Sequence, residues 1–207
     1  MKTEEPLWDA ADIMRVGKDL FVQLSIKTIQ TGFEWLKRYF EGKGFRVHPM
    51  LFNTSLPWHV DTTFFATRPG LFFRNKTLFS LDEGSDGLLK LNDWEIVNLV
   101  TPNTEGRHPL AGSSVYMAHN VLSINPNTIV AEAGQTEIME QLAKYDPESV
   151  PVPFNSVAPF GGTLHCATCD VYRECDMEDY FPKHIPGILI HTIILDGTGN
   201  SLPCLFL

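Results

Sequence analysis

Cys166 carries the most reactive side chain in this sequence, because a thiol can act as a nucleophile, a metal ligand or a redox partner. It directly follows His165, and Cys169 lies three positions further on. A cysteine nucleophile needs a histidine to move protons and a carboxylate to orient that histidine, and both can come from distant parts of a chain. A buried, inert cysteine is the commoner case.

Cys166 and Cys169 also form a C-x-x-C pair, which is typical of a zinc site or of a redox-active dithiol. A zinc site needs two more ligands at suitable spacing. Only His165, Cys175 and His184 are near in sequence, and there is no second C-x-x-C pair. Zinc binding and redox chemistry are therefore the weaker alternatives.

Further polar residues stand at comparable places along the chain, each just before an apolar segment. They are Asp9 and Asp12, His59 and Asp61, and Ser113 and Ser114. If His59 and Asp61 lie in a strand, their side chains point to the same side of it. Any one of these residues could serve solubility alone, but their recurrence in phase with a structural repeat favours a shared function.

The elements that would position these residues follow a repeated order of strand, strand, helix and strand. The first repeat is predicted as strands at 12–16 and 19–24, a helix at 28–40 and a strand at 45–52. The helix is indicated by apolar residues that recur at helical spacing. Repeats of about 50 residues are too small to bury their own apolar faces, so they must pack on one another.

Two more repeats and the start of a fourth follow along the chain. Their predicted elements are strands at 60–66 and 70–73, a helix at 81–92 and a strand at 95–100; then strands at 115–124 and 128–132, a helix at 135–144 and a strand near Val150; then a strand within 162–171. The sequence therefore predicts an α/β repeat architecture of about three and a half units.

The composition is that of an ordinary globular protein, with 43% hydrophobic and 20% charged residues among 207. The net charge of −9 argues against nucleic acid and anionic membranes as partners, because both require a basic surface. No apolar stretch approaches the roughly 18 residues of a membrane span. All four cysteines fall in the last fifth of the chain, which argues against a disulfide scaffold and favours a reducing compartment.

Four segments resemble motifs of the arginine:glycine amidinotransferases, in the same order. The segment 5–12 resembles E-P-x-x-D-A-A-D, 58–64 resembles M-H-I-D-x-T-F, 108–114 resembles H-P-L-x-x-S-S, and 161–171 resembles G-G-x-x-H-C-x-T-C-D-V. The similarity runs from about residue 4 to 181. We therefore expect a catalytic domain over 4–181 and a divergent tail of unassigned role over 182–207.

The resemblance implies the α/β propeller of the pentein superfamily, with five units around a pseudo-fivefold axis. Family members carry one to two further units before the first motif, including another acid that touches the guanidinium. This chain begins eight residues ahead of Asp9. We therefore expect an incomplete propeller, from a truncated gene product, a fragment or a shortened paralogue.

The resemblance also implies roles for the residues that match its motifs. Cys166 would be the nucleophile, His59 the general acid and base, and Asp9 the carboxylate partner of His59. The donor would be bound by Asp61, Ser113 and Ser114. The amidino group of arginine would pass through Cys166 to a primary amine, foremost glycine, which gives guanidinoacetate and ornithine.

Such covalent chemistry needs no metal and no organic cofactor. The expected partners are small-molecule substrates, with a homo-oligomer left open. The expected location is the cytoplasm, or the mitochondrion if a targeting N-terminus is missing.

One departure from the family concerns the donor's carboxylate. The family's anchoring arginine, about seventeen residues after the motif aspartate, falls here on Leu78, with Arg74 and Lys76 as substitutes. Lysine lacks the bidentate fork that a carboxylate prefers. Alternatives are thus a hydrolase related to arginine deiminase, an amidinotransferase of guanidino natural-product biosynthesis, and an incomplete piece without catalysis.

Overall fold

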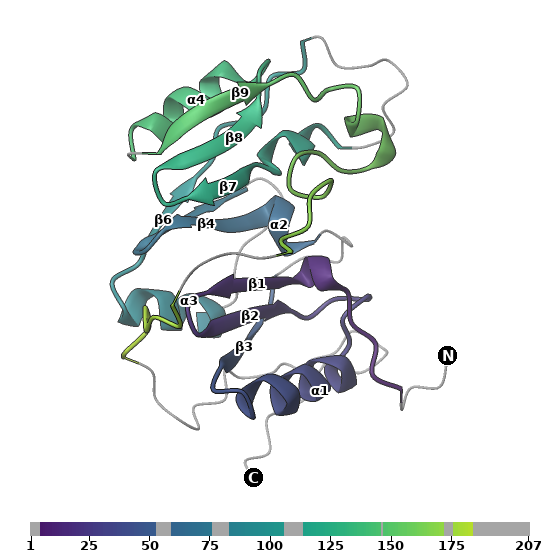
Figure 1. The fold of residues 1–207 in the computed structure, drawn as a ribbon, viewed down its shortest axis with the longest axis vertical. Helices are drawn as coiled ribbons and strands as arrows, with labels where there is room; N and C mark the ends of the chain where they lie inside the picture. Colours follow the sequence, from purple (N-terminus) through teal and green to yellow (C-terminus); the bar gives the residue numbers. More distant parts are fainter. Residues whose placement is uncertain are drawn as a thin grey trace.

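The described part of the chain contains three small mixed sheets, each with three strands (Figure 1). The computed structural model describes residues 5–52, 59–75, 83–105, 114–145, 147–171 and 176–183. In every sheet the first two strands form an antiparallel hairpin, and the third strand runs parallel to the second. The predicted α/β repeat is confirmed.

The first unit shows how the sequence makes this pattern. It consists of β1 (Ile13–Val16), β2 (Asp19–Gln23), α1 (Gln30–Glu41) and β3 (Arg46–Met50). Gly17 makes the turn between β1 and β2 with φ of +62°, a conformation that favours glycine. Phe33 and Leu36 lie on the buried side of α1, so the helix covers its own sheet.

The second and third units repeat the order. They consist of β4 (Phe64–Arg68), β5 (Leu71–Arg74), α3 (Glu83–Leu91) and β6 (Glu95–Asn98), then β7 (Leu122–Asn125), β8 (Thr128–Glu132), α4 (Thr136–Ala143) and β9 (Glu148–Val152). None of the helices in the described ranges is long and apolar enough to cross a membrane.

A short helical turn precedes the first strand of each unit, which the sequence prediction missed. These turns are η1 (Ala10–Asp12), α2 (Val60–Thr63) and η2 (Val115–His119). The strands predicted at 60–66 and 115–124 therefore begin too early, and His59 and Asp61 do not share one side of a strand. Local hydrogen bonds favour the turns, since the Thr63 hydroxyl donates to the carbonyl oxygen of His59 at 3.2 Å.

The strand predicted within 162–171 is also wrong. A short helix, η3 (Ala158–Phe160), leads into a succession of turns. The amide of Ala167 donates to Thr163 at 2.9 Å, and that of His165 donates to Asn120 at 3.3 Å. The backbone thus bonds within its own turn and to the third unit rather than along a strand.

Apolar side chains pack between neighbouring units, as expected for a repeat fold. One cluster joins the first and second units and another joins the second and third. Phe181 is fully buried in the first cluster and stacks on Trp94, with ring centroids 4.7 Å apart. Phe181 thus anchors the otherwise mostly exposed segment 176–183 to the core, and residues 184–207 of the predicted tail lie outside the described residues.

Candidate active site

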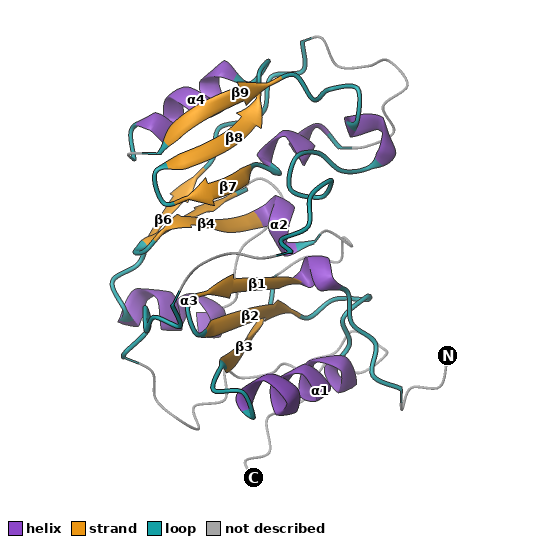
Figure 2. Cartoon of the chain, in the orientation of Figure 1, coloured by secondary structure: helices purple, strands orange, loops and turns teal. Residues whose placement is uncertain are grey.

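Residues predicted to form the site occupy the same place in successive repeats, at the start of the helical turns. Asp9 precedes η1 and accepts the amide of Ala11 at 3.1 Å, and Ser114 precedes η2 and accepts the amide of Tyr116 at 3.2 Å. His59 precedes α2. The turns lie at corresponding ends of the sheets (Figure 2). The recurrence thus corresponds to the N-cap positions of the turns rather than to strand ends, and Asp9 and Ser114 cap their turns with the side chain whereas His59 does not.

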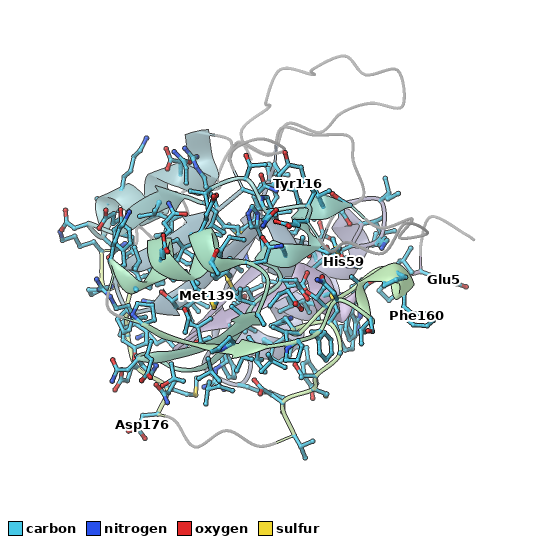
Figure 3. All side chains as sticks on the ribbon, turned by 90° about the horizontal axis from the view of Figure 1, so that it is seen from above. Glu5, His59, Tyr116, Met139, Phe160 and Asp176 are labelled. Atoms are coloured by element: carbon cyan, nitrogen blue, oxygen red, sulfur yellow. The ribbon has the colours of Figure 1, made fainter. Side chains whose placement is uncertain are left out.

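Asp9 and His59 are in contact although fifty residues separate them. The Oδ2 atom of Asp9 lies 3.1 Å from Nε2 of His59. Both side chains are partly open to solvent, with 38% of Asp9 and 25% of His59 exposed, and Figure 3 labels His59 among the side chains of the whole chain. A carboxylate so placed stabilises the imidazolium form of a histidine.

Lys27 is a second neighbour of His59 that the sequence prediction missed. Its Nζ atom lies 2.8 Å from the same ring nitrogen, Nε2. Lys27 belongs to the loop 25–28, which lies over the buried carboxylate of Asp12. Burial raises the pKa of Asp12, against the lowering effect of hydrogen bonds from Thr28 and Ser25.

Cys166 and His165 both approach the carboxylate of Asp61. Its Oδ2 atom lies 3.1 Å from Nδ1 of His165 and 3.3 Å from Sγ of Cys166. Burial alone would raise the pKa of Asp61, but the hydrogen bond and charge of His165 outweigh it, so the net shift is downward. Asp61 is thus held as an anion inside α2.

Desolvation, together with the same carboxylate, disfavours the thiolate form of Cys166. Cys166 is exposed as a residue, yet its sulfur end lies against Asp61. Desolvation of the sulfur, the negative charge of Asp61 and the hydrogen bond to it raise the pKa of Cys166 to about 11. A cation bound beside both groups would reverse this effect.

Asn120 fixes the cysteine loop and carried no signal in the sequence. It is fully buried, and its Oδ1 accepts the amide of Cys166 at 2.9 Å and that of Thr163 at 3.4 Å. Its Nδ2 donates to the carbonyl oxygen of Asp61 at 3.4 Å. One amide side chain therefore ties the nucleophile candidate to α2.

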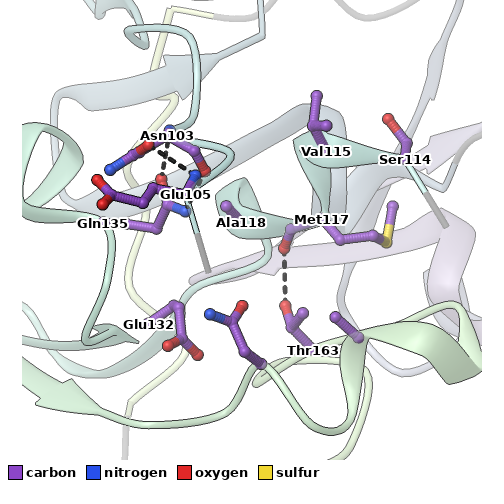
Figure 4. A pocket seen from close by; sticks show the side chains of 11 residues that line it. Asn103, Glu105, Ser114, Val115, Met117, Ala118, Glu132, Gln135 and Thr163 are labelled. Atoms are coloured by element: carbon purple, nitrogen blue, oxygen red, sulfur yellow. Dashed lines mark hydrogen bonds between the residues drawn. The ribbon is translucent and has the colours of Figure 1, made fainter. Parts of the chain in front are cut away.

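Of the two serines predicted to bind the donor, the structure describes only Ser114. Ser114 lines a small pocket together with Glu105, Glu132 and Thr163 (Figure 4). Ser113 lies outside the described residues.

Of the residues considered as the anchor of the donor's carboxylate, the structure describes only Arg74. Lys76 and Leu78 lie outside the described residues. Arg74 directs its Nε to Oδ1 of Asn98 at 2.7 Å, so this nitrogen is already engaged within the second sheet.

The metal-site alternative finds no support where the chain is described. No group of three or more His, Cys, Asp or Glu side chains there is arranged to hold a metal ion. Cys175 and His184, the further ligands considered, lie outside that part.

Comparison with known proteins finds amidinotransferases at 30% identity or more. Over 86% of its length the chain is 33% identical to the mitochondrial glycine amidinotransferase of Xenopus laevis, of which it covers 41%. Over 85% of its length it is 30% identical to the L-arginine:L-lysine amidinotransferase of Pseudomonas savastanoi pv. phaseolicola, of which it covers 47%. No protein-family model matches the chain.

A solved structure has the same fold. An amidinotransferase from Microseira wollei in the saxitoxin biosynthetic pathway superposes with a TM-score of 0.76 at 30% identity. The match covers 86% of this chain and 51% of that one. The expected pentein-type propeller is thereby confirmed, and the chain spans about half the length, or less, of the proteins that it matches.

Proposed function

Because this chain belongs to the amidinotransferase family, we propose that it moves the amidino group of arginine to a primary amine, most simply glycine, through a covalent intermediate on Cys166. The observation that carries the proposal is the convergence of Cys166 and His165 on Asp61, with the Asp9–His59 pair at the start of the same helical turn. The names of the relatives support the reaction class and leave the acceptor to experiment.

Asp61 would bind the guanidinium of the donor. A guanidinium is planar, always cationic and a poor electrophile, so it must be held and desolvated beside a nucleophile. Asp61 is anionic and lies 3.3 Å from the sulfur, which would put the central carbon of a bound guanidinium within reach of Sγ. The cation would also offset the negative charge that keeps the thiol protonated.

The chemical steps follow from these positions. Cys166 loses its proton to solvent as the cation binds, and Sγ then forms a bond to the central carbon. The carbon–nitrogen bond to the ornithine side breaks, and His59 as imidazolium protonates that departing amine. Neutral His59 next takes a proton from the incoming amine, which attacks the same carbon and releases the thiolate.

Ser113 and Ser114 would hold the remainder of the donor. Ser114 already faces the pocket of Figure 4, and its hydroxyl can donate to a carboxylate while its oxygen caps η2. A free thiol is essential to this chemistry, so we propose a reducing compartment, the cytoplasm or the mitochondrion.

The test is direct detection of the intermediate. The chain is incubated with arginine labelled in its guanidino carbon, alone and mixed with the N-terminal half of the Xenopus laevis relative, and digested for peptide mass spectrometry. We expect one labelled amidino group on Cys166, absent in Cys166→Ser and retained in the matched Cys169→Ser. Ornithine should appear as the label is added to Cys166, and glycine added afterwards should release labelled guanidinoacetate and remove the label from the protein.

Three outcomes contradict the proposal. A label on Cys169 refutes the assigned nucleophile. So does the absence of any label both in the chain alone and in the chain mixed with the N-terminal half of the relative. Release of citrulline in place of a guanidino product identifies a hydrolase.

A further inference from the structure

We infer that Lys27 is a positioning residue for His59, and that the ammonium of Lys27 donates to the ring nitrogen Nε2 whenever that nitrogen carries no proton. The importance of this role for turnover rests on the proposed function, in which His59 moves the protons. The contact between Lys27 and His59 does not depend on the proposed function.

The two neighbours of Nε2 require opposite states of that nitrogen. Asp9 presents a carboxylate oxygen at 3.1 Å, which is satisfied only if Nε2 carries a proton to donate. Lys27 presents an ammonium at 2.8 Å, which has only protons to give and is satisfied only if Nε2 has a free lone pair. A single ring nitrogen cannot meet both demands. Asp9 therefore stabilises the imidazolium, and Lys27 stabilises the neutral ring.

Lys27 is held at this position by the loop that carries it. The oxygen of Ser25 accepts the amide of Lys27 at 2.9 Å and that of Thr28 at 3.0 Å. Both hydroxyls donate to Oδ2 of the fully buried Asp12, Ser25 at 2.8 Å and Thr28 at 2.7 Å. Most surface lysine side chains adopt many conformations. The backbone that carries Lys27 is held by hydrogen bonds to Ser25, whose hydroxyl bonds to the buried carboxylate of Asp12.

The same anchor holds the competing partner. The amide of Asp9 donates to the hydroxyl oxygen of Thr28 at 3.0 Å. Thr28 therefore fixes the relative positions of the carboxylate and the ammonium that compete for His59. A fixed cation on one side and a fixed anion on the other are what a group needs to change its protonation state within each reaction cycle.

Among the described residues, Asp12 and Asp61 are the other charged groups to consider near the imidazole ring of His59. Asp12 acts on His59 through its charge, from behind Thr28. Asp61 lies on α2 itself, but its carboxylate is directed at His165 and Cys166. Removal of the charge of Lys27 therefore leaves the carboxylates of Asp9 and Asp12 acting on His59, and both favour the imidazolium.

The consequence concerns the second half of the proposed reaction. Once His59 has protonated the departing amine, it must stay neutral until the incoming amine arrives. The ammonium of Lys27 satisfies the lone pair during that interval and opposes uptake of a proton from solvent.

The experiment follows the ring of His59 by NMR in protein labelled at histidine, as a function of pH, in the native chain and in three variants. Lys27→Met keeps most of the length and removes the charge, Lys27→Arg keeps the charge, and Lys37→Met makes the same change in the exposed Lys37–Glu41 pair of α1. We expect the midpoint of the His59 titration to rise by about one pH unit in Lys27→Met, as for a charge at contact distance near a protein surface. The midpoints of the other two variants should stay at the native value.

An unchanged midpoint in Lys27→Met, or an equal rise in Lys37→Met, overturns the inference. Because the titration requires no turnover, it can succeed even if no adduct forms on Cys166, and it can fail in a chain that does form one. In a form of the protein that turns over, the pH at which kcat falls to half on its acidic side should rise by the same amount in Lys27→Met, with little change in KM.

Discussion

The sulfur of Cys166 and a carboxylate oxygen of Asp61 lie 3.3 Å apart, so the candidate nucleophile faces an anion in the unliganded protein. This arrangement raises the pKa of Cys166 to about 11, with desolvation as the largest cause and Asp61 next. Both causes disfavour the thiolate, and a cation bound beside Asp61 would oppose the second of them. Under the proposed function, binding of a cationic donor would therefore promote the nucleophilicity of the cysteine.

Asp61→Asn should make Cys166 more reactive towards iodoacetamide at pH 8. Asparagine keeps the shape of the side chain and removes the charge that opposes the thiolate. Each unit by which the pKa of Cys166 falls increases the thiolate fraction about tenfold at a pH below that pKa. The alkylation rate of the Cys166 peptide, measured by mass spectrometry, should rise several-fold to about tenfold.

The matched control is Asp176→Asn, which removes an exposed acid of the segment 176–183. Its Cys166 peptide should be alkylated at the native rate. If Asp61→Asn leaves that rate unchanged as well, Asp61 does not govern the thiol.

Asp9→Asn should reduce amidino transfer while leaving the fold intact. Asparagine caps a helix as well as aspartate does, so the bond from the Ala11 amide survives and the free energy of unfolding should change by less than about 0.5 kcal/mol. The carboxylate facing His59 is lost, and general acid–base catalysis typically contributes a factor of about 100 to 10,000.

Two measurements check this prediction, the rate of ornithine release and urea unfolding. Asp9→Ala serves for comparison, because it should lose the cap as well, at a cost of about 1 kcal/mol. A native rate in Asp9→Asn would exclude Asp9 from the proton chemistry.

The repeat could be predicted from the sequence because the spacing of apolar residues and the turn residues indicate the strands and helices of each unit. What failed was the start of the second and third units, where α2 and η2 replace predicted strands. A turn of four or five residues with apolar and polar side chains has no periodicity that distinguishes it from a strand. There the capping of Tyr116 by Ser114 and the hydroxyl of Thr63 favour the helical turn.

Residues of the candidate site could be predicted from the sequence only where the residue type itself indicates a chemical role. Asp9, His59 and Cys166 were predicted as site residues from their resemblance to family motifs, and the structure brings the first two into contact. Lys27 and Asn120 were missed, because each acts on a residue far away in sequence, 32 positions from His59 and 46 positions from Cys166. A lysine in a loop and an asparagine after an apolar segment are ordinary by composition, and only the fold gives them partners.

Gly162→Ala should displace the cysteine loop. A Cβ at this position would lie 2.5 Å from Cβ and 3.1 Å from Sγ of Cys166, closer than real contacts allow. We expect a loss of about 1–3 kcal/mol in the free energy of unfolding, as for other overpacked positions, and a changed alkylation rate of Cys166.

Gly87→Ala provides the comparison for Gly162→Ala, since a Cβ there meets no atom within 4 Å and the residue lies inside α3. That change should stabilise the protein by roughly 0.5–1 kcal/mol. Equal effects of the two substitutions would show that the close approach of Gly162 to Cys166 is unimportant.

Acid should release the segment 176–183 from the first unit through protonation of Asp179. Desolvation of the carboxylate, the largest single cause, raises the pKa of Asp179, but the hydrogen bonds and charges of Arg46 and Lys18 together outweigh it and lower the value from 3.8 to about 2. The folded pKa lies below the unfolded one, so this stabilisation is fully present above about pH 4 and is lost as the pH falls through about 2. Release should alter the fluorescence of Trp94, because Phe181 stacks on its ring and the carbonyl oxygen of Tyr180 accepts its indole N–H at 3.3 Å.

Substitution of Asp179 separates this acid transition from general unfolding. Asp179→Asn should already show the released fluorescence at neutral pH, or a much smaller change between pH 4 and 2, since the charged partner of Arg46 and Lys18 is gone. Asp93→Asn breaks the more exposed pair with Lys183 on the same segment and should keep the native acid transition, because exposed pairs contribute little. If both variants behave alike, Asp179 does not hold the segment, and its aromatic contacts alone retain Phe181 against Trp94.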